Sequence, residues 1–332
     1  MKPYYYLIIA ILFVQCKPVQ KKYMYNEGEV FGTFYHITYE SPNGKDLLNE
    51  IKTKFNEFDL SLSTYNPHSI ISRINSNEPD VKTDAYFEEM FAMAQQVSEK
   101  SDGAFDITVA PLVNAWGFGY TNEDRQTIPT VDTIMPFVGY KKIRLENHHL
   151  IKTHPKIRLD AGAISGGQIS DVIAHLLDKL GCDNYLVEIG GEITCKGVNN
   201  KGKKWNIGID KPTDDPTSDN KELQTIISVS DVGLSTSGNY REFYYKDGKK
   251  YAHTIDPKTG VPVQHNLLSA TVIAPTCMQA DAYATAFMVL GVEKSINLCE
   301  SMAGMECYLI YQDKDGINKI AQTKGFQKYI TK

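Results

Sequence analysis

This chain of 332 residues lacks several features that mark whole classes of protein. It contains no internal repeat and no low-complexity run, so a solenoid or a fibrous architecture is excluded. It has no block of Lys and Arg, and its formal net charge is −5, which argues against nucleic acid as the main partner. The remaining composition, 42% hydrophobic and 23% charged, is that of a globular protein with ample length for a large core.

Cysteines are few, and their spacing matches no metal or redox motif. Of the six, one lies at position 16 and the others are Cys182, Cys195, Cys277, Cys299 and Cys307. None of them forms a C-x-x-C pair, so a zinc or redox site is not indicated. Five later cysteines is an odd number, so a complete disulfide framework is not implied, and we expect most of them to be core thiols.

One apolar run stands out, over residues 4–14 behind Lys2. Its eleven residues are too few to span a bilayer but suit the apolar part of an export signal. The run ends shortly before Cys16, as in bacterial lipoprotein signals, where this cysteine is acylated and becomes the new N-terminus. We therefore expect a lipoprotein signal over residues 1–16. An ordinary secretory signal or a short N-terminal anchor are the alternatives.

The rest of the chain reads as one domain with alternating helix and strand patterns. Residues 17–28 are polar and are predicted to be a tether, and residues 29–332 the domain. Apolar spacing predicts helices at 46–62 and 84–100, one ending near 180, one around 278–290 and one at 292–302. Strands are predicted at 30–39, 184–189, 205–210, 223–232, 267–274, 305–311 and 317–322, with hairpins within 138–159 and 242–253.

The helix around residues 278–290 carries a candidate metal site. Asp281 and Thr285 are four residues apart, so they lie on one face of the helix, one turn above the other. A carboxylate and a hydroxyl are hard oxygen donors of the kind that Mg²⁺ takes, alongside water and phosphate. The alternative is structural: an Asp near the helix N-terminus and a buried Thr that bonds its own backbone.

Two further segments point to a ligand. Residues 160–171 are rich in small side chains and lead from a strand into a helix, where the backbone can approach a ligand and the helix N-terminus favours phosphate. This segment is neither a G-x-G-x-x-G fingerprint nor a P-loop. Asp106 lies in an apolar run, where burial requires hydrogen-bond partners, either structural backbone groups or a bound ligand.

Taken together and in order, the motifs of this chain resemble the ApbE family, the FAD:protein FMN transferases. The motifs that carry the resemblance are Ser63-Thr64-Tyr65, Gly103-Ala104-Phe105-Asp106, Trp116-Gly117-Phe118-Gly119, residues 160–171, Gly190-Gly191-Glu192-Ile193, Ser235-Thr236-Ser237-Gly238, residues 253–260 and residues 279–285. They cover the chain from about residue 31 to 291. The resemblance implies one α/β (α+β mixed) domain, with mixed sheets, packed helices and two lobes around an FAD cleft.

The family cleaves the pyrophosphate of FAD, moves FMN onto a Thr or Ser of an acceptor protein through a phosphoester bond, and releases AMP. By resemblance, Mg²⁺ is held by the Ala163 carbonyl and the side chains of Asp281 and Thr285, and Asp281 is catalytic. His253 matches the histidine that activates the acceptor hydroxyl, a role that suits a neutral imidazole. The FAD contacts carried over from the family are Phe31, Tyr65, Ala104, Phe105, Asp106, Asp160, Gly166 and Ile255.

Three positions depart from the family pattern. Phe31 stands where Met is frequent, which keeps an apolar contact. Gly166 replaces a Lys or Glu beside the flavin site, and Gln168 replaces a Tyr. Losing the charge or the aromatic ring is expected to weaken FAD binding or to shift the balance between transfer and hydrolysis of FAD. Gly166→Lys is expected to tighten FAD binding.

Two other functions stay open at this point. A Mg²⁺-dependent FAD pyrophosphatase giving FMN and AMP uses the same site with water as the acceptor. A non-catalytic FAD-binding lipoprotein needs neither His253 nor the pair Asp281 and Thr285, which speaks against it. The expected partners are FAD, a lipid anchor and a separate acceptor, a flavoprotein subunit of a membrane electron-transfer complex. The expected location is the cell envelope, on the periplasmic side of a membrane.

Overall fold

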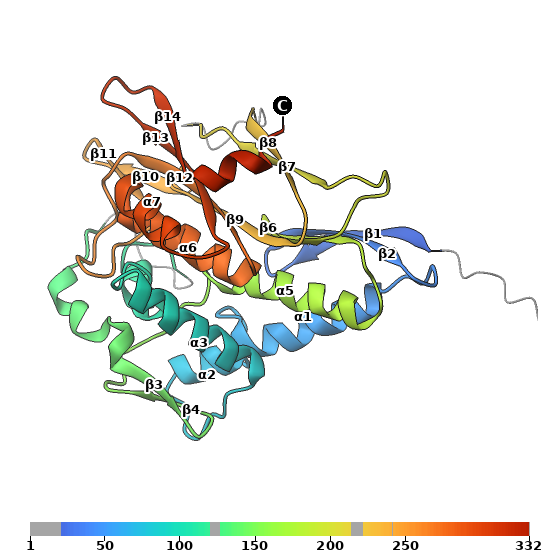
Figure 1. The fold of residues 1–332 in the computed structure, drawn as a ribbon. Helices are drawn as coiled ribbons and strands as arrows, with labels where there is room; N and C mark the ends of the chain where they lie inside the picture. Colours follow the sequence, from blue (N-terminus) through green and yellow to red (C-terminus); the bar gives the residue numbers. More distant parts are fainter. Residues whose placement is uncertain (1–20, 120–126, 214–221, 241, 332) are drawn as a thin grey trace, which may run out of the picture.

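The computed structural model of this chain describes residues 21–119, 127–213, 222–240 and 242–331 (Figure 1). The expected signal segment with Cys16 lies outside these residues. Among the helices that are described, none combines the length and the apolar character needed to cross a bilayer.

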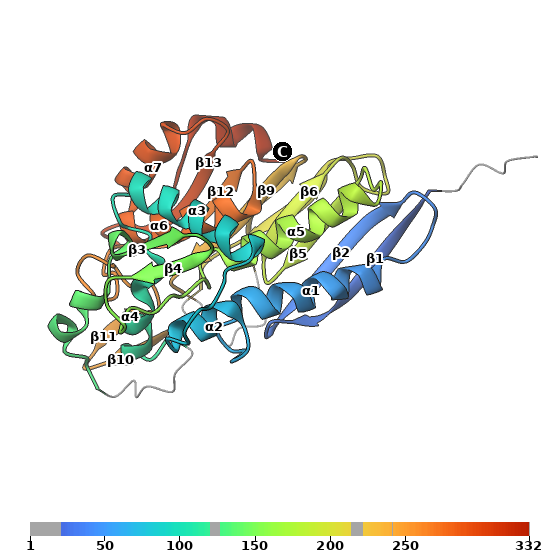
Figure 2. The same ribbon diagram turned by 90° about the horizontal axis from the view of Figure 1, so that it is seen from below.

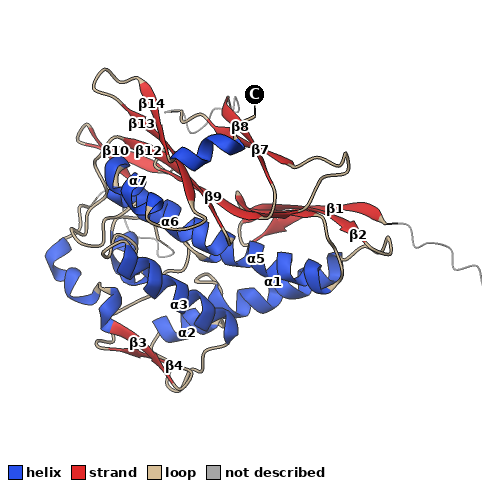
Figure 3. Cartoon of the chain, in the orientation of Figure 1, coloured by secondary structure: helices blue, strands red, loops and turns tan. Residues whose placement is uncertain are grey.

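A large antiparallel sheet forms the centre of the fold. In the described part of the chain it has eight strands in the order β1-β2-β5-β6-β9-β12-β13-β14, and all neighbours run antiparallel. These strands are β1 (Lys22–Val30), β2 (Thr33–Ser41), β5 (Tyr185–Ile189), β6 (Glu192–Lys196), β9 (Val232–Gly238), β12 (Leu267–Ala274), β13 (Glu306–Gln312) and β14 (Asn318–Gln322). The helices α1, α5, α6 and α7 lie on one side of this sheet and β7 and β8 on the other (Figures 1 and 3), and Figure 2 shows the molecule from the side of these helices.

The remaining elements surround this sheet. The helices are α1 (Leu48–Leu62), α2 (Ile70–Asn75), α3 (Ala85–Lys100), α4 (Ala110–Ala115), α5 (Ser165–Lys179), α6 (Cys277–Leu290) and α7 (Val292–Glu300). The paired short strands are β3 (Ile143–Glu146) with β4 (His149–Lys152), β7 (Trp205–Asp210) with β8 (Leu223–Val229), and β10 (Phe243–Lys246) with β11 (Lys249–Ala252). The 3₁₀ helices are η1 (Ile107–Val109), η2 (Val131–Thr133), η3 (Met135–Phe137), η4 (Tyr140–Lys142) and η5 (Lys324–Tyr329).

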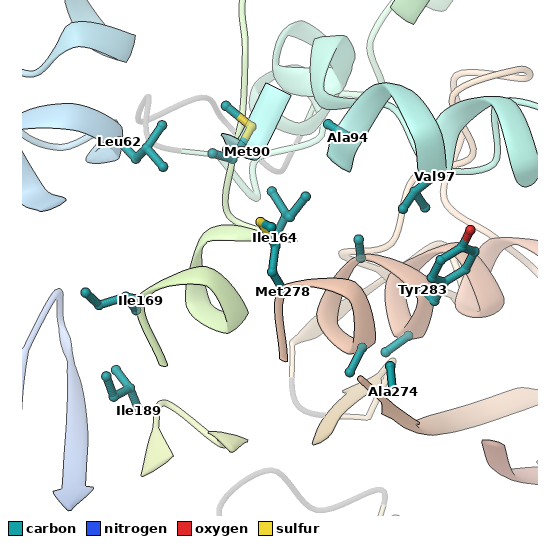
Figure 4. Packing of buried hydrophobic residues seen from close by; sticks show 14 of the residues in the cluster. Leu62, Met90, Ala94, Val97, Ile164, Ile169, Ile189, Ala274, Met278 and Tyr283 are labelled. Carbon is teal, nitrogen blue, oxygen red and sulfur yellow. The ribbon is translucent and has the colours of Figure 1, made fainter. Parts of the chain in front are cut away.

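The central strands carry apolar residues on both faces, because helices cover one face and β7 and β8 cover the other. In β12, Val272 packs with the helices and its neighbour Ile273 packs with β7 and β8, and Leu309 and Ile310 of β13 divide in the same way. Figure 4 shows part of the helix side, where Met278 is among the buried residues. Burial on both faces holds the middle strands of the sheet rigidly, and the functional residues described below lie on or next to these strands.

Helix α6 is buried on nearly all sides, and its N-terminus is closely packed. Gly167 of α5 and Gly233 of β9 both press against Cys277, and a Cβ at either glycine would collide with its backbone. The buried carboxylate of Asp171 accepts hydrogen bonds from the first amides of α6, at 3.0 Å from Cys277 N and 2.9 Å from Met278 N. Free amides and the helix dipole favour an anion at this position. The position of α6 is therefore set by α5 and β9.

Most elements expected from the sequence are present, and the mixed α/β class is confirmed. The described cysteines are buried and free, as expected for core thiols. Residues 22–28, which were expected to be part of the tether, belong to β1, and this strand pairs along its length with β2. Strand β1 is a largely exposed edge strand, so it lacks the clear apolar alternation by which strands are recognised. Helices α2 and α4, at six residues each, were also missed.

Candidate functional site

The predicted metal ligands of α6 face two serines of strand β9. The Ser235 hydroxyl lies 3.3 Å from Asp281 Oδ1, and the Ser237 hydroxyl lies 3.2 Å from Thr285 Oγ1. Four helix residues rise about 6 Å and two strand residues about 6.7 Å, so the two pairs match in spacing. A row of four oxygen-bearing side chains results between α6 and β9. The Thr285 hydroxyl thus has a partner on β9, and Asp281 lies within α6, beyond its first turn.

Asp281 is a buried carboxylate with neutral partners. It accepts hydrogen bonds from Gly167 N at 3.0 Å and from Ser235 Oγ. Burial raises the pKa of Asp281 well above its usual range, and the nearby Glu192 carboxylate raises it further. A divalent cation would offset both effects. The donor set of Asp281, Thr285 and the Ala163 carbonyl therefore fits a hard cation such as Mg²⁺.

The candidate metal site depends on hydroxyl and carbonyl oxygens as well as on a carboxylate. Within the described residues, no group of three or more His, Cys, Asp or Glu side chains is placed to hold a metal ion. A site formed by one carboxylate, a hydroxyl and a carbonyl leaves coordination positions for water and for phosphate oxygens of a ligand. This composition suits a metal that binds together with its substrate.

The metal-site residues open into a cavity of about 410 Å³, here called cavity one. Its wall includes the three predicted metal ligands and six other predicted residues: Ala104, Phe105, Asp106, Asp160, His253 and Ile255. The wall also includes Val113 and Phe118, which pack, like Ile255, in a small apolar cluster around Trp116. Cavity one is thus lined by residues of the main core, such as Phe105, and by residues of this smaller cluster.

The carboxylates of Asp106 and Asp160 accept hydrogen bonds from neighbouring groups of the protein. The Asp106 carboxylate accepts hydrogen bonds from Thr108 N at 2.8 Å, Thr108 Oγ1 at 2.6 Å and Tyr140 N at 2.7 Å. Burial nevertheless raises its pKa above the ordinary value. Asp160 accepts from Gly162 N at 2.8 Å, and burial raises the pKa of Asp160 as well. Of the two explanations for Asp106, structural backbone partners are observed, and its carboxylate shapes the cavity wall.

His253 follows strand β11 at the rim of cavity one. Its Nδ1 lies 3.2 Å from the Glu242 carbonyl oxygen, and the ring packs edge-on against Phe118 at 6.4 Å between centroids. With Nδ1–H donating to this carbonyl, Nε2 is the nitrogen with the free lone pair. The turn after His253 is fixed by a hydrogen bond that Trp116 Nε1 donates to the Gly260 carbonyl at 2.8 Å. The side chain is partly exposed and can meet a group that approaches from solvent.

A second cavity of about 680 Å³, here called cavity two, is lined by the other predicted residues, Phe31, Tyr65 and Gly166. Phe31 and Gly32 form the two-residue turn between β1 and β2, with φ of 53° and 75°. Positive φ suits this hairpin turn but costs a non-glycine residue about 1–2 kcal/mol. The Phe31 ring packs on Phe55 and Phe58, at 5.9 and 6.0 Å between centroids. Tyr65 is 79% exposed at the edge of the same cavity.

The two cavities meet at Gly162 and Glu192, which lie in both walls. The predicted contacts are therefore divided, with the metal-site residues in cavity one and the exposed aromatic rings in cavity two. A ligand with two ring systems and a charged linker would place the linker near Gly162. Asp281 and Ala163 are in the wall of cavity one beside this junction.

The structure also explains the departures noted in the sequence. A Cβ added at Gly166 would lie 3.1 Å from Glu192 Oε2, so the Glu192 side chain borders the space that a residue at 166 would use. Gln168 faces helix α3, where its Nε2 donates to the Tyr86 carbonyl at 2.9 Å and to Glu89 at 3.2 Å. Gln168 is in neither cavity wall, so the expectation that this position affects FAD directly is not supported.

Sequence reasoning missed three residues of the site: Glu192, Ser235 and Ser237. Each lies in a motif that was noted, but no role followed from the motif. Strand alternation offers the signal that was available, since Ile193 and Leu234 face β7 and β8 and their neighbours Glu192 and Ser235 face the helices. Which helix Glu192 and Ser235 contact depends on how the helices pack on the sheet, and strand alternation does not predict this.

The fold and these features define an enzyme of mixed α and β structure with a two-compartment cleft and an oxygen-rich donor set at the junction. The chain belongs to the ApbE family, whose model matches residues 31–309.

Individual relatives agree over nearly the whole chain. The FAD:protein FMN transferase of Haemophilus influenzae is 35% identical, over 93% of this chain and 92% of its own length. That of Escherichia coli K12 is also 35% identical, over 98% and 96%. The solved structure of the flavin transferase ApbE from Vibrio cholerae superposes with a TM-score of 0.83 at 34% identity, covering 93% of this chain and 100% of that one. The flavinyl transferase ApbE of Pseudomonas stutzeri gives a TM-score of 0.82 at 31% identity, over 93% and 97%.

Proposed function

We propose that this chain transfers the FMN part of FAD to a Thr or Ser hydroxyl of an acceptor protein and releases AMP. Its relatives carry the name FAD:protein FMN transferase. The observation that carries the proposal is the pair of cavities joined at Gly162 and Glu192, with Asp281 beside the junction. FAD has two ring systems joined by a pyrophosphate, so its rings fit the two cavities and its pyrophosphate the junction.

Asp281, Thr285 and the Ala163 carbonyl would hold Mg²⁺ in this proposal. A bound Mg²⁺ would neutralise charge on the pyrophosphate and stabilise the departing phosphate of AMP. Ser235 and Ser237 orient the two side-chain ligands through the hydrogen bonds described above. Asp171 holds the N-terminus of α6, so it fixes the helix on which both ligands lie.

His253 acts on the acceptor hydroxyl. Nε2 accepts the hydroxyl proton, while Nδ1–H stays on the Glu242 carbonyl and keeps the ring in position. The acceptor oxygen forms a bond to the FMN phosphorus, and the bond from that phosphorus to the bridging oxygen breaks. The electron pair of the broken bond leaves with AMP, and the proton remains on the imidazole.

The acceptor is proposed to be a separate protein, a flavoprotein subunit of a membrane electron-transfer complex. Within this chain the nearest match to an acceptor sequence is Ser269-Ala270-Thr271, in strand β12. Ser269 and Thr271 are 1% and 0% exposed, and β12 pairs with both β9 and β13. This central strand cannot present a hydroxyl at the rim of cavity one.

We also propose that the chain is exported and lipid-anchored at Cys16, on the periplasmic side of a membrane. The apolar run before Cys16 is the support for this proposal. Metabolic labelling with a fatty acid should label the wild-type protein and not Cys16→Ser. Absence of label in wild type, or equal label in both proteins, would contradict the lipid anchor at Cys16.

The proposed function is tested by following both products. The full chain in detergent is mixed with FAD, Mg²⁺ and candidate acceptor domains, with AMP measured by chromatography and covalent flavin by in-gel fluorescence. Equal amounts of AMP and fluorescent acceptor would support transfer. AMP with free FMN and no labelled acceptor would favour the pyrophosphatase. FAD binding without AMP would favour a non-catalytic binder.

A further inference from the structure

Glu192 is a charged residue at the junction of the two cavities whose role the proposed mechanism leaves open. It begins β6, directly after Gly190 and Gly191, whose φ values are 69° and 107°. This turn brings the start of β6 to the wall of both cavities. Because Ile193 packs with β7 and β8, strand alternation turns Glu192 toward the helices.

The main chain of Glu192 is held in place, and its side chain lies beside two glycines. Its carbonyl oxygen accepts a hydrogen bond from Ser170 Oγ of α5 at 3.1 Å. Its side chain lies against Gly166 and Gly190, where an added Cβ would be 3.1 Å from Oε2 in each case. A side chain at either glycine would crowd this carboxylate. The sequence around Glu192 therefore leaves room for it at the junction.

Glu192 is linked to Asp281 through one hydroxyl. Ser235 Oγ lies 3.4 Å from Glu192 Oε1 and 3.3 Å from Asp281 Oδ1, and it can donate to either. Ser235 is 1% exposed and Asp281 is 5% exposed, whereas Glu192 is partly exposed at the cavity walls. Two carboxylates that share one hydroxyl repel each other, and burial of one of them strengthens the repulsion. Their proximity is favourable when a cation lies between or beside them.

Glu192 would also face the pyrophosphate of FAD, which is negative. A carboxylate in that place weakens substrate binding unless it acts on the cation that accompanies the substrate. Mg²⁺ usually keeps several water molecules, and groups that hydrogen-bond the ligands of a metal commonly set its affinity. The location of Glu192 beside Asp281 suits such a group.

We propose that Glu192 is a positioning residue of the metal site, which binds metal-coordinated water and, through Ser235, orients Asp281. This inference rests on the proposed function, since it concerns the same metal site. It assigns to Glu192 the affinity and placement of the metal at the junction of the two cavities. Glu192 does not act on the acceptor hydroxyl in this proposal, and His253 takes that role.

The test measures metal binding without FAD, so that it does not depend on catalysis. Mn²⁺ is titrated into the full chain in detergent, and free Mn²⁺ is followed by electron paramagnetic resonance, with competition by Mg²⁺. Glu192→Gln keeps the size and the hydrogen-bonding capacity and removes the charge. We expect Glu192→Gln to weaken metal binding about 10- to 100-fold. The metal affinity of Glu192→Asp should lie between those of wild type and Glu192→Gln.

Two further variants make the result specific. Glu188→Gln, on the neighbouring strand β5, removes a carboxylate that lies 3.6 Å from His36 and is in neither cavity wall, so its metal affinity should equal wild type. Asp281→Asn should abolish binding. Wild-type affinity in Glu192→Gln, with binding abolished in Asp281→Asn, would overturn the role of Glu192 and leave the proposed function standing. No binding by wild type, with or without added AMP, would overturn the metal site and the role of Glu192 together.

A folding defect is separated from a loss of metal binding by a second measurement. Thermal unfolding of each variant is recorded with and without Mg²⁺, because a ligand that binds the folded state raises its stability. Glu192→Gln should keep a cooperative transition and show a smaller Mg²⁺-dependent rise in Tm than wild type. A full rise in Tm in this variant would contradict the proposal.

Discussion

Two carboxylates in the wall of cavity one are fixed by hydrogen bonds within the protein, whereas two aromatic rings of cavity two are exposed to solvent. Asp281 is 5% exposed and Asp106 is 6% exposed, against 79% for Tyr65 and 40% for Phe31. The first pair accepts hydrogen bonds from neighbouring amides and hydroxyls, and Phe31 is held mainly by ring packing. Preorganised polar groups lower a reaction barrier, while exposed rings add affinity by covering a ligand. The comparison therefore assigns chemistry to cavity one and binding to cavity two.

The largest effect is expected from Asp281→Asn, which removes the carboxylate of the metal site in cavity one. We expect the kcat/KM for AMP release to fall about 1,000-fold, because charge stabilisation at the pyrophosphate is lost. AMP is measured by chromatography at saturating Mg²⁺, with circular dichroism as the control for folding. A variant that keeps a tenth of wild-type activity would show that the chemistry does not depend on Asp281.

His253→Asn should affect transfer of FMN to the acceptor more than hydrolysis of FAD by water. Covalent labelling of the acceptor is expected to fall about 100- to 1,000-fold, as for the loss of a general base. AMP release to water should fall less, because Asp281 and Thr285 remain. His265→Asn is the matched control, since His265 is in neither cavity wall. Equal losses of labelling and AMP release would contradict a role restricted to the acceptor.

Tyr65→Ala tests cavity two. We expect the Kd for FAD to rise about 5- to 10-fold, the value of one aromatic contact at a partly open site. The effect on KM should exceed the effect on kcat, in contrast to Asp281→Asn. Phe34→Ala is the control, because Phe34 is 62% exposed and lies near the same hairpin turn but outside both cavity walls. A larger effect on kcat than on KM would break the assignment of binding to cavity two.

The smallest effect is expected from Gly166→Lys at the junction. The new Cβ would meet the flexible end of Glu192, which can shift, and the ammonium group would lie near the pyrophosphate. FAD affinity should increase about 2- to 5-fold at low salt and less at high salt, as for a partly exposed charge. Titration followed by flavin fluorescence measures this, with Gly166→Gln as the uncharged control. Unchanged or weaker affinity would contradict the expectation.

The separate elements of the site were predictable because their signals are local. The four-residue spacing of Asp281 and Thr285 on an apolar helix, and the small residues before α5, follow from neighbours in the chain. The nine predicted residues of cavity one lie together, and the three others lie together in cavity two. Their division between two cavities was not foreseen, because no local pattern states the distance between segments.

The amino-acid sequence by itself determined the family, the α/β class and which side chains can donate oxygen to a cation. These depend on residue type and on spacing within one helix or one turn. The tertiary structure decided that Ser235 and Ser237 match Asp281 and Thr285, that Glu192 stands at the junction, and that Gln168 turns away toward α3. Such contacts join residues more than 40 positions apart, and they exist because the sheet and helices pack in one particular arrangement.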